Sequence, residues 1–203
     1  MPGTSLRFTG LRRRFGRLAV LEGVSGAVAE GEALLVTGPN GSGKSTLLRC
    51  LAGLLAPDAG TVELTEEGRL LDPAGRRRSV GYVAPDLAFY EELTAGENLA
   101  FFSRLRGAPP ARGQDLLARL GLPAERQAGA LSSGMRQRLR WVWALLHRPR
   151  LLLLDEPFQN LDAGGEAAAR ALLAEHLAAG GLAVVANPSP LELGRAAPNL
   201  ALG

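Results

Sequence analysis

Residues 38–45 read GPNGSGKS, a glycine-rich segment that matches the pattern G-x-x-x-x-G-K-[ST]. An apolar run precedes it and a segment with helical apolar spacing follows it, as a loop between a strand and a helix requires. Glycines allow successive backbone N–H groups to surround a phosphate chain, and the helix that follows adds its positive end. The residues expected to contact phosphate are Gly38, Pro39, Asn40, Gly41, Ser42, Gly43, Lys44, Ser45 and Thr46.

Lys44 is the only lysine among the 23 Lys and Arg residues of the chain. A compact ammonium with three rotatable donors suits the β- and γ-phosphates of ATP, whereas the wide, planar guanidinium of arginine fits a tight loop poorly. Ser45 is placed to bind Mg²⁺. The alternative, an ordinary glycine turn that caps a helix, does not account for the complete pattern or for the single lysine.

A second segment, LLLLDE at residues 151–156, is expected to supply the carboxylates of the same site. Four leucines predict a buried strand, and Asp155 and Glu156 follow at its carboxyl end. Asp155 is assigned to Mg²⁺, directly or through water, and Glu156 to orienting and polarising the water that attacks the γ-phosphate. The alternative is a strand that ends in two solvated acids.

The elements that would position these residues follow an alternating order of strands and helices. Apolar runs at 32–38, 150–157 and 182–186 predict buried strands, and helical spacing is found at 44–55 and 134–149. Thr94 and Glu97 form a capping-box pattern ahead of another helix. We therefore expect an α/β fold with a mostly parallel sheet, forming one domain over 1–203 with a helical insertion at roughly 86–148.

Composition sets limits on the environment and on the class of partner. A hydrophobic fraction of 46% and a formal charge of +3 are ordinary for a soluble protein. The arginine runs at 12–14 and 76–78 are interpreted as solvated turns, so no nucleic-acid partner is expected. Cys50 is the single cysteine, which excludes an internal disulfide and fits a reducing compartment. The N-terminal segment MPGTSLRFTG has no apolar core of signal-peptide length, and no apolar stretch has the length of a membrane span.

The segment LSSGM at residues 131–135 resembles the LSGGQ signature of ABC-type ATPases, the nucleotide-binding subunits of ABC transporters. Loop, signature, carboxylate strand and Asp162 come in the order of that family. The resemblance implies an ABC ATPase fold, which is a P-loop NTPase core with an N-terminal antiparallel β portion and a helical signature subdomain. It also implies ATP and Mg²⁺ as cofactors.

The resemblance further implies that two copies face each other across two ATP molecules, in a homodimer or a heterodimer. Ser132, Ser133 and Gly134 of one copy would then close on the γ-phosphate held by the other. Asp162 would organise contacts between the copies, and Phe15 would stack on adenine, unless it is a plain core aromatic.

The sequence departs from the family pattern at positions that affect turnover. Pro85 takes the place of the usual glutamine, and Asp86 beside it could bind the metal or cap a turn. Pro188 takes the place of the usual histidine, and the Asn187 amide could donate a hydrogen bond there but cannot accept a proton. Ser133 and Met135 replace the first glycine and the glutamine of the signature. We therefore expect a slow but competent ATPase.

Neither histidine is expected to take over the missing role. His147 ends the signature helix, where a cation would interact favourably with the helix dipole, and His176 is expected to be a solvated mid-helix residue.

The leading functional interpretation is an energy-coupling subunit that is cytoplasmic, peripheral on the inner face of the cell membrane, and bound to a multi-span transmembrane subunit. Leu87, Phe89 and Tyr90 would either contact that subunit or pack under the helical insertion. The segment around them resembles small bacterial exporters, including the heme-export type. The alternatives are a soluble ABC-type ATPase acting on nucleic acid or ribosomes, and a nucleotide-sensing module with little turnover.

Overall fold

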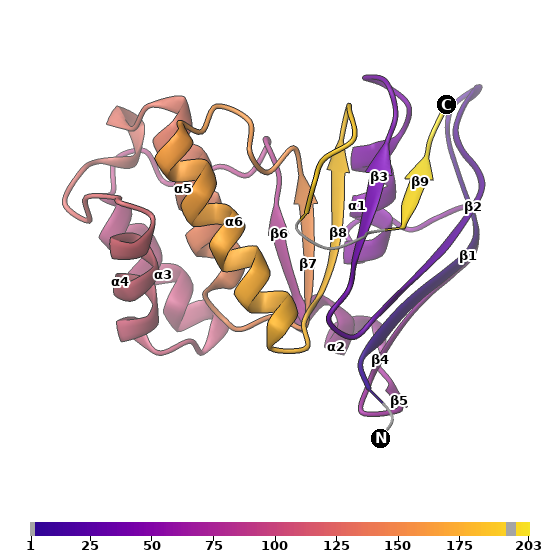
Figure 1. The fold of residues 1–203 in the computed structure, drawn as a ribbon, viewed down its shortest axis with the longest axis horizontal. Coiled ribbons are helices and arrows are strands. Elements are labelled where there is room, and N and C mark those ends of the chain that lie inside the picture. Colours follow the sequence, from indigo (N-terminus) through magenta and orange to yellow (C-terminus); the bar gives the residue numbers. More distant parts are fainter. Residues whose placement is uncertain (1–2, 194–197) are drawn as a thin grey trace.

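The computed structural model describes residues 3–193 and 198–203, and its strands form two sheets (Figure 1). The parallel sheet has the order β6–β7–β8–β3–β9, with β3 (Ala33–Thr37), β6 (Val80–Val83), β7 (Leu151–Asp155), β8 (Leu182–Asn187) and β9 (Asn199–Ala201). The antiparallel sheet has the order β2–β1–β4–β5, with β1 (Ser5–Phe15), β2 (Leu18–Ala29), β4 (Ala59–Glu66) and β5 (Arg69–Leu70). The predicted fold class is confirmed, although β9 was not predicted.

The helices cover the parallel sheet on two sides (Figure 1). Helix α1 (Lys44–Ala52) contacts β7 and β8 on one side and β2 of the antiparallel sheet on the other. The remaining helical elements are α2 (Pro73–Arg78), α3 (Ala95–Arg106), α4 (Pro110–Arg119), the 3₁₀ helix η1 (Ala128–Ala130), α5 (Ser133–Leu145) and α6 (Ala163–Ala178). Helices α3, α4 and α5 lie within the segment that was predicted as the helical insertion.

Strand β7 shows why the central strands are apolar throughout. Its leucines are all fully buried, and successive residues belong to different cores. Leu152 and Leu154 pack with α4, α5 and α6, whereas Leu151 and Leu153 pack with α1 and the antiparallel sheet. A parallel strand covered on both faces has no solvent side, so the run needs no polar alternation. The polar residue Asp155 comes only where the strand ends.

Helix α3 begins at the predicted capping box. The Thr94 hydroxyl accepts from the Glu97 backbone N–H at 3.1 Å, and the Glu97 carboxylate accepts from the Thr94 N–H at 2.8 Å. These two bonds satisfy donors that the first turn leaves free.

The two arginine runs are not solvated turns. Arg12, Arg13 and Arg14 belong to β1, and Arg76, Arg77 and Arg78 form the last turn of α2. Within the described ranges, no helix has the length and hydropathy needed to cross a membrane.

Candidate functional site

The glycine-rich loop joins the carboxyl end of β3 to the first residue of α1. Gly43 is the N-cap of α1 and has a φ of 96°, in the left-handed region that favours glycine. A Cβ on this residue would lie 2.8 Å from the Val20 carbonyl oxygen, so close packing also excludes a side chain. No side chain caps α1, and its first backbone N–H groups stay open toward the loop. The loop therefore has the concave backbone that an anion requires.

Lys44 is 5% exposed and its ammonium points back into this loop. Its Nζ donates to the carbonyl oxygens of Gly38 and Pro39, at 2.7 and 2.8 Å. The Ser42 hydroxyl is also buried, with no hydrogen-bond partner among the described residues. A buried cation and an unsatisfied hydroxyl beside open N–H groups fit a polyphosphate.

A cavity of about 430 Å³ connects the loop with two predicted residues from distant parts of the sequence. Its lining includes Phe15 at the end of β1 and Glu156 after β7, together with Val20, Asn40, Gly41, Gly43, Lys44, Ser45 and Thr46. Phe15 is 48% exposed, so the core-aromatic alternative is wrong. The Arg13 guanidinium lies 5.0 Å from the centre of the Phe15 ring, and Asp58 holds Arg13 at 2.7 Å.

Asp155 lies at the carboxyl end of β7 and is 3% exposed. Burial raises the pKa of its carboxyl, a hydrogen bond with the Ser45 hydroxyl opposes the rise, and the neighbouring Glu156 adds to it. Lys44 and Arg49 contribute smaller lowering effects. A hydroxyl and a carboxylate oxygen in contact are a fitting start for a Mg²⁺ site, because this ion prefers oxygen ligands and is usually completed by phosphates and water.

The backbone fixes the position of Glu156. Its φ of 47° is uncommon for a non-glycine residue. The Glu156 N–H donates to Ala186 at 2.9 Å, and its carbonyl accepts from the Gln137 side chain at 3.2 Å. Gln137 also donates to the Pro157 carbonyl at 2.9 Å. Gln137 was not predicted, since only the fold brings α5 next to this turn.

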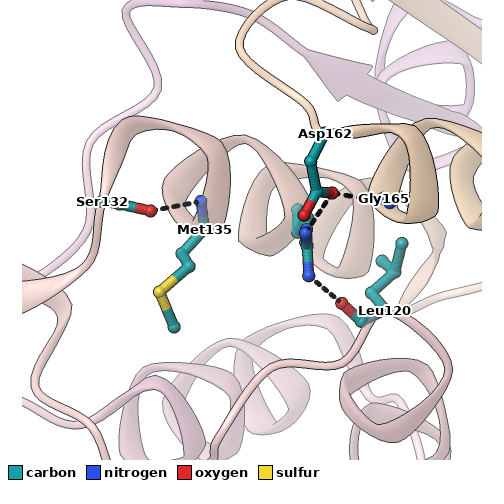
Figure 2. A network of polar contacts seen from close by, with 6 residues as sticks. Leu120, Ser132, Met135, Asp162 and Gly165 are labelled. Carbon is teal, nitrogen blue, oxygen red and sulfur yellow. Dashed lines mark hydrogen bonds and ion pairs between the residues drawn. The ribbon is translucent and has the colours of Figure 1, made fainter.

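The signature residues form the start of α5 (Figure 2), and none of them lines the cavity. Ser132 is the N-cap, and its hydroxyl accepts from the Met135 backbone N–H at 3.2 Å. A Cβ on Gly134 would lie 2.5 Å from the Asn160 carbonyl oxygen, so this position has room only for glycine. Ser133 is exposed. The signature and the phosphate loop of one chain therefore do not share a cavity.

Asp162 connects the start of α6 with α5 and α4 through Arg138 (Figure 2). The Asp162 carboxylate accepts from the Gly165 N–H at 2.8 Å and forms an ion pair with Arg138, whose other Nη donates to the Leu120 carbonyl at 3.2 Å. The Gly165 hydrogen bond and then Arg138 lower the pKa of Asp162. Arg138 was not predicted, because nothing in the local pattern of α5 indicates a partner on α6.

Asp86 and Asn187 lie beside Pro85 and Pro188, the two prolines that replace polar residues of the family pattern. Both have hydrogen-bond partners that were not predicted. The Asp86 carboxylate forms an ion pair with Arg49 of α1 at 2.8 Å, which matches neither the metal site nor the capped turn. The Asn187 amide donates to the Ser189 carbonyl at 2.7 Å, within its own turn. Neither residue lines the cavity of the phosphate loop.

The turn after β6 is held to the signature helix by Arg140. Its guanidinium donates to the carbonyl oxygens of Pro85, at 2.7 Å, and Leu87, at 3.3 Å. The Arg140 side chain of α5 thus holds the backbone of the turn that follows β6.

Both interpretations of the histidines are wrong. His147 does not act as a cation, because burial and the nearby Arg106 lower its pKa to about 4. His176 is not a solvated mid-helix residue: it lies near the end of α6, its Nε2 is 3.0 Å from the Leu182 carbonyl oxygen, and burial lowers its pKa.

An aromatic cluster covers the outside of the helical segment. It comprises Phe89, Tyr90, Phe101, Phe102 and Trp143, with centroid distances from 3.9 Å for Phe102–Trp143 to 6.4 Å for Phe89–Phe102. Tyr90 and Phe101 are 50% and 45% exposed. This segment was expected either to contact a membrane subunit or to pack under the helices. Phe89 packs against the core of the helical segment, whereas half of the Tyr90 side chain stays exposed to solvent.

Comparisons with known proteins agree with this arrangement. A family model described as "ABC transporter" matches residues 21–159. The chain is 42% identical over 181 residues to the Fe(3+) ions import ATP-binding protein FbpC 1 of Rhodococcus jostii, covering 86% of the chain and 52% of the relative. It is 43% identical over 163 residues to the sulfate/thiosulfate import ATP-binding protein CysA of Bradyrhizobium diazoefficiens, covering 75% and 47%. The chain thus spans about half the length of the curated relatives it matches.

Solved structures give the same assignment of the fold. A structure of the ATP-binding subunit of an ABC transporter superimposes with a TM-score of 0.79 and 30% identity, covering 90% of this chain and 79% of that one. A structure assigned to an ABC transporter ATP-binding protein from Pyrococcus furiosus superimposes with a TM-score of 0.80 at 21% identity, covering 98% and 97%. The second likeness shows the fold alone.

Proposed function

Because the chain belongs to the ABC transporter ATP-binding family, whose members bind ATP with Mg²⁺ and hydrolyse it in transport, we propose that it powers a membrane transporter by ATP hydrolysis. The observation that carries the proposal is the single cavity in which Phe15, Lys44, Ser45 and Glu156 meet. A base-stacking ring, a phosphate-binding loop and a carboxylate for water are the parts that phosphoryl transfer to water requires.

The roles of the side chains follow from their positions. On ATP binding, the Lys44 ammonium replaces its hydrogen bonds to the two loop carbonyls with hydrogen bonds to phosphate oxygens. The ammonium is already buried, so the exchange adds no further desolvation free energy. Ser45 and Asp155 would hold Mg²⁺, which supplies charge neutralisation between the phosphates. Glu156 accepts a hydrogen bond from the attacking water and holds it in line with the γ-phosphate.

A second ATPase copy is part of the proposal. The signature of one chain lies outside its own cavity, whereas Ser133, at the start of α5, is exposed and available to another molecule. We propose that this helix start approaches the γ-phosphate bound by a partner copy. The dipole of α5 favours negative charge at that end.

Turnover is proposed to be slow. Pro85 and Pro188 lack side-chain donors, and the Asn187 amide is engaged by Ser189. Loss of one donor to the transition state typically lowers turnover by ~10²–10³-fold. The same observation favours, as a second candidate, a nucleotide-sensing module with little turnover.

The proposed membrane contact is the exposed part of the aromatic cluster. Tyr90 and Phe101 form an apolar surface next to the turn after β6, and exposed aromatic patches of this kind commonly mark interfaces. The occupant we propose is a cytoplasmic segment of a multi-span transmembrane subunit, with the chain peripheral on the inner face of the membrane. The two relatives described above are named as import proteins, which favours uptake over the export expected from the sequence and gives no support to a nucleic-acid role.

The central experiment measures steady-state hydrolysis of Mg²⁺–ATP by the wild type and by Glu156→Gln. We expect a low but measurable rate that falls at least ~10²-fold in the variant, with ATP binding retained. Equal rates in the two proteins would refute the catalytic role of Glu156. Binding without detectable hydrolysis in the wild type would favour the sensing module.

Two further measurements test the partners. Gel filtration of Glu156→Gln with ATP is expected to show a dimer, and a persistent monomer would contradict a dimer formed without other subunits. Purification in detergent is expected to retain a multi-span membrane protein, whereas bound RNA in its place would favour the nucleic-acid class.

A further inference from the structure

A second cavity, of about 370 Å³, lies at the opposite edge of the parallel sheet from the phosphate loop. Its lining includes Arg150 and Gly181, which precede β7 and β8, whereas Asp155 is the last residue of β7 and the loop follows the carboxyl end of β3. The end of α5 and helices α4 and α6 complete the walls. This cavity is separate from the proposed ATP site.

Four arginines line the cavity, and only two of them are paired with carboxylates. Arg119 pairs with Glu175 at 2.5 Å, and Arg150 pairs with Glu66 at 2.6 Å. Arg112 and Arg148 form no ion pair with any residue in the described ranges. The cavity wall therefore carries an excess of positive charge.

Arg112 is anchored in a way that leaves its outer nitrogens available. Its Nε donates to the Leu145 carbonyl at 3.0 Å, and within residues 3–193 and 198–203 its two Nη groups have no hydrogen-bond partner. Burial lowers the pKa of Arg112 and repulsion from Arg148 lowers it further, Asp115 opposes the fall, and Arg119 adds to it. Guanidiniums placed together without full compensation are stabilised when an anion binds between them.

Arg148 is held at the cavity by an unusual backbone. Its φ of 53° lies in the left-handed region, and Pro149 follows it in the turn between α5 and β7. The side chain of Arg148 makes no hydrogen bond within the part of the chain that the structure describes. Leu116, Leu145 and Leu172 complete the wall with apolar surface, which lowers the local dielectric and strengthens charge contacts.

We propose that this cavity binds a phosphate group, either inorganic phosphate or that of a small phosphate ester. Planar guanidiniums from α4 and from the turn before β7 match the bidentate geometry of phosphate oxygens. His176 lines the same cavity, and burial lowers the pKa of its imidazole, so the positive charge of the lining comes from the arginines. The bound anion bridges α4 to the turn before β7.

The test uses Lys44→Ala protein, in which the phosphate loop has lost its cation, with inorganic phosphate and glycerol phosphate as probes. Titrations are followed by calorimetry at constant ionic strength, with chloride as the control anion. Imidazole NMR signals report the position of binding, because His176 lines the cavity and the other histidine, His147, does not.

Saturable binding of one or both probes, with a shift of the His176 signal, is the expected result, and the stronger probe identifies the source of the phosphate group. Arg148→Gln and Arg112→Gln should each weaken binding at least about tenfold. Arg17→Gln, at an exposed arginine outside this lining, should leave the affinity unchanged. Because Arg148 is exposed, its variant tests the site even if Arg112→Gln fails to fold.

Three results would overturn the proposal. They are no binding beyond the chloride control, binding that is unaffected by both arginine variants, and binding that leaves the His176 signal unshifted.

Discussion

Acid should weaken the fold through His147, at the end of the signature helix. Its Nε2 lies 3.1 Å from the Val80 carbonyl oxygen, so the neutral ring donates from this nitrogen. The buried Nδ1 has no partner among the described residues. A proton added there would be a donor without an acceptor, near the guanidiniums of Arg106 and Arg112.

The size of the effect follows from the pKa in the two states. Burial first, then Arg106, lower the pKa from 6.5 to about 4, while the Val80 contact opposes and Arg112 adds to the fall. The unfolded chain therefore binds more protons between these values. The stabilisation is complete above about pH 6.5 and is lost as the pH falls toward about 4. Between about pH 7.5 and pH 5 the loss is about 2 kcal/mol, out of about 3 kcal/mol for the complete shift.

The assay is urea unfolding of wild type and His147→Gln across this pH range. Glutamine keeps an N–H donor for Val80 but cannot be protonated. We expect the free energy of unfolding of the wild type to fall by about 2 kcal/mol more than that of the variant. His176 and Asp155 titrate in both proteins, so their contributions cancel in the difference. Parallel curves for the two proteins would refute the assignment of a buried, neutral His147.

Two other substitutions test the site. Lys44→Arg is expected to weaken ATP binding on the order of tenfold to hundredfold, because the longer, planar group cannot occupy the space between the Gly38 and Pro39 carbonyls. Titration with a fluorescent ATP analogue measures the affinity, and an affinity equal to that of the wild type would contradict the prediction. Gly134→Ala is expected to destabilise the chain by about 1–3 kcal/mol through the Asn160 contact, as measured by urea unfolding. Gly164→Ala, where a Cβ would meet open space, is its matched control, and equal effects of the two changes would exclude the proposed clash.

Local patterns were sufficient to predict the elements that carry the phosphate loop and the Asp155–Glu156 carboxylates. Apolar runs, the capping box at Thr94 and Glu97, and the glycine loop each depend on neighbours in sequence. The family resemblance supplied the antiparallel portion, which the local pattern did not. The G-x-x-x-x-G-K-[ST] motif indicated that Lys44 and Ser45 lie where the phosphate loop meets the following helix.

Contacts between distant elements could not be predicted. Arg138 reaches Asp162 and Leu120, and Arg140 reaches Pro85, only because α5 packs beside α6, α4 and the turn after β6. The histidines were misread for the same reason: exposure at a helix end depends on what packs there, and the carbonyls of Val80 and Leu182 come from other segments. The arginine runs were wrongly interpreted as turns because the sequence did not indicate strand β1 and helix α2, to which they belong.

The signature has a consequence for how such motifs are retained in evolution. Ser132 caps α5 and Gly134 makes room for Asn160, so both would be under selection for folding even in a descendant that had ceased to hydrolyse ATP. The two departures from the family motif fall at Ser133, which is exposed, and at Met135, of which the cap uses only the backbone N–H. Relaxed selection on catalysis would leave this same record: Ser132 and Gly134 kept by the fold, and the exposed Ser133 free to change.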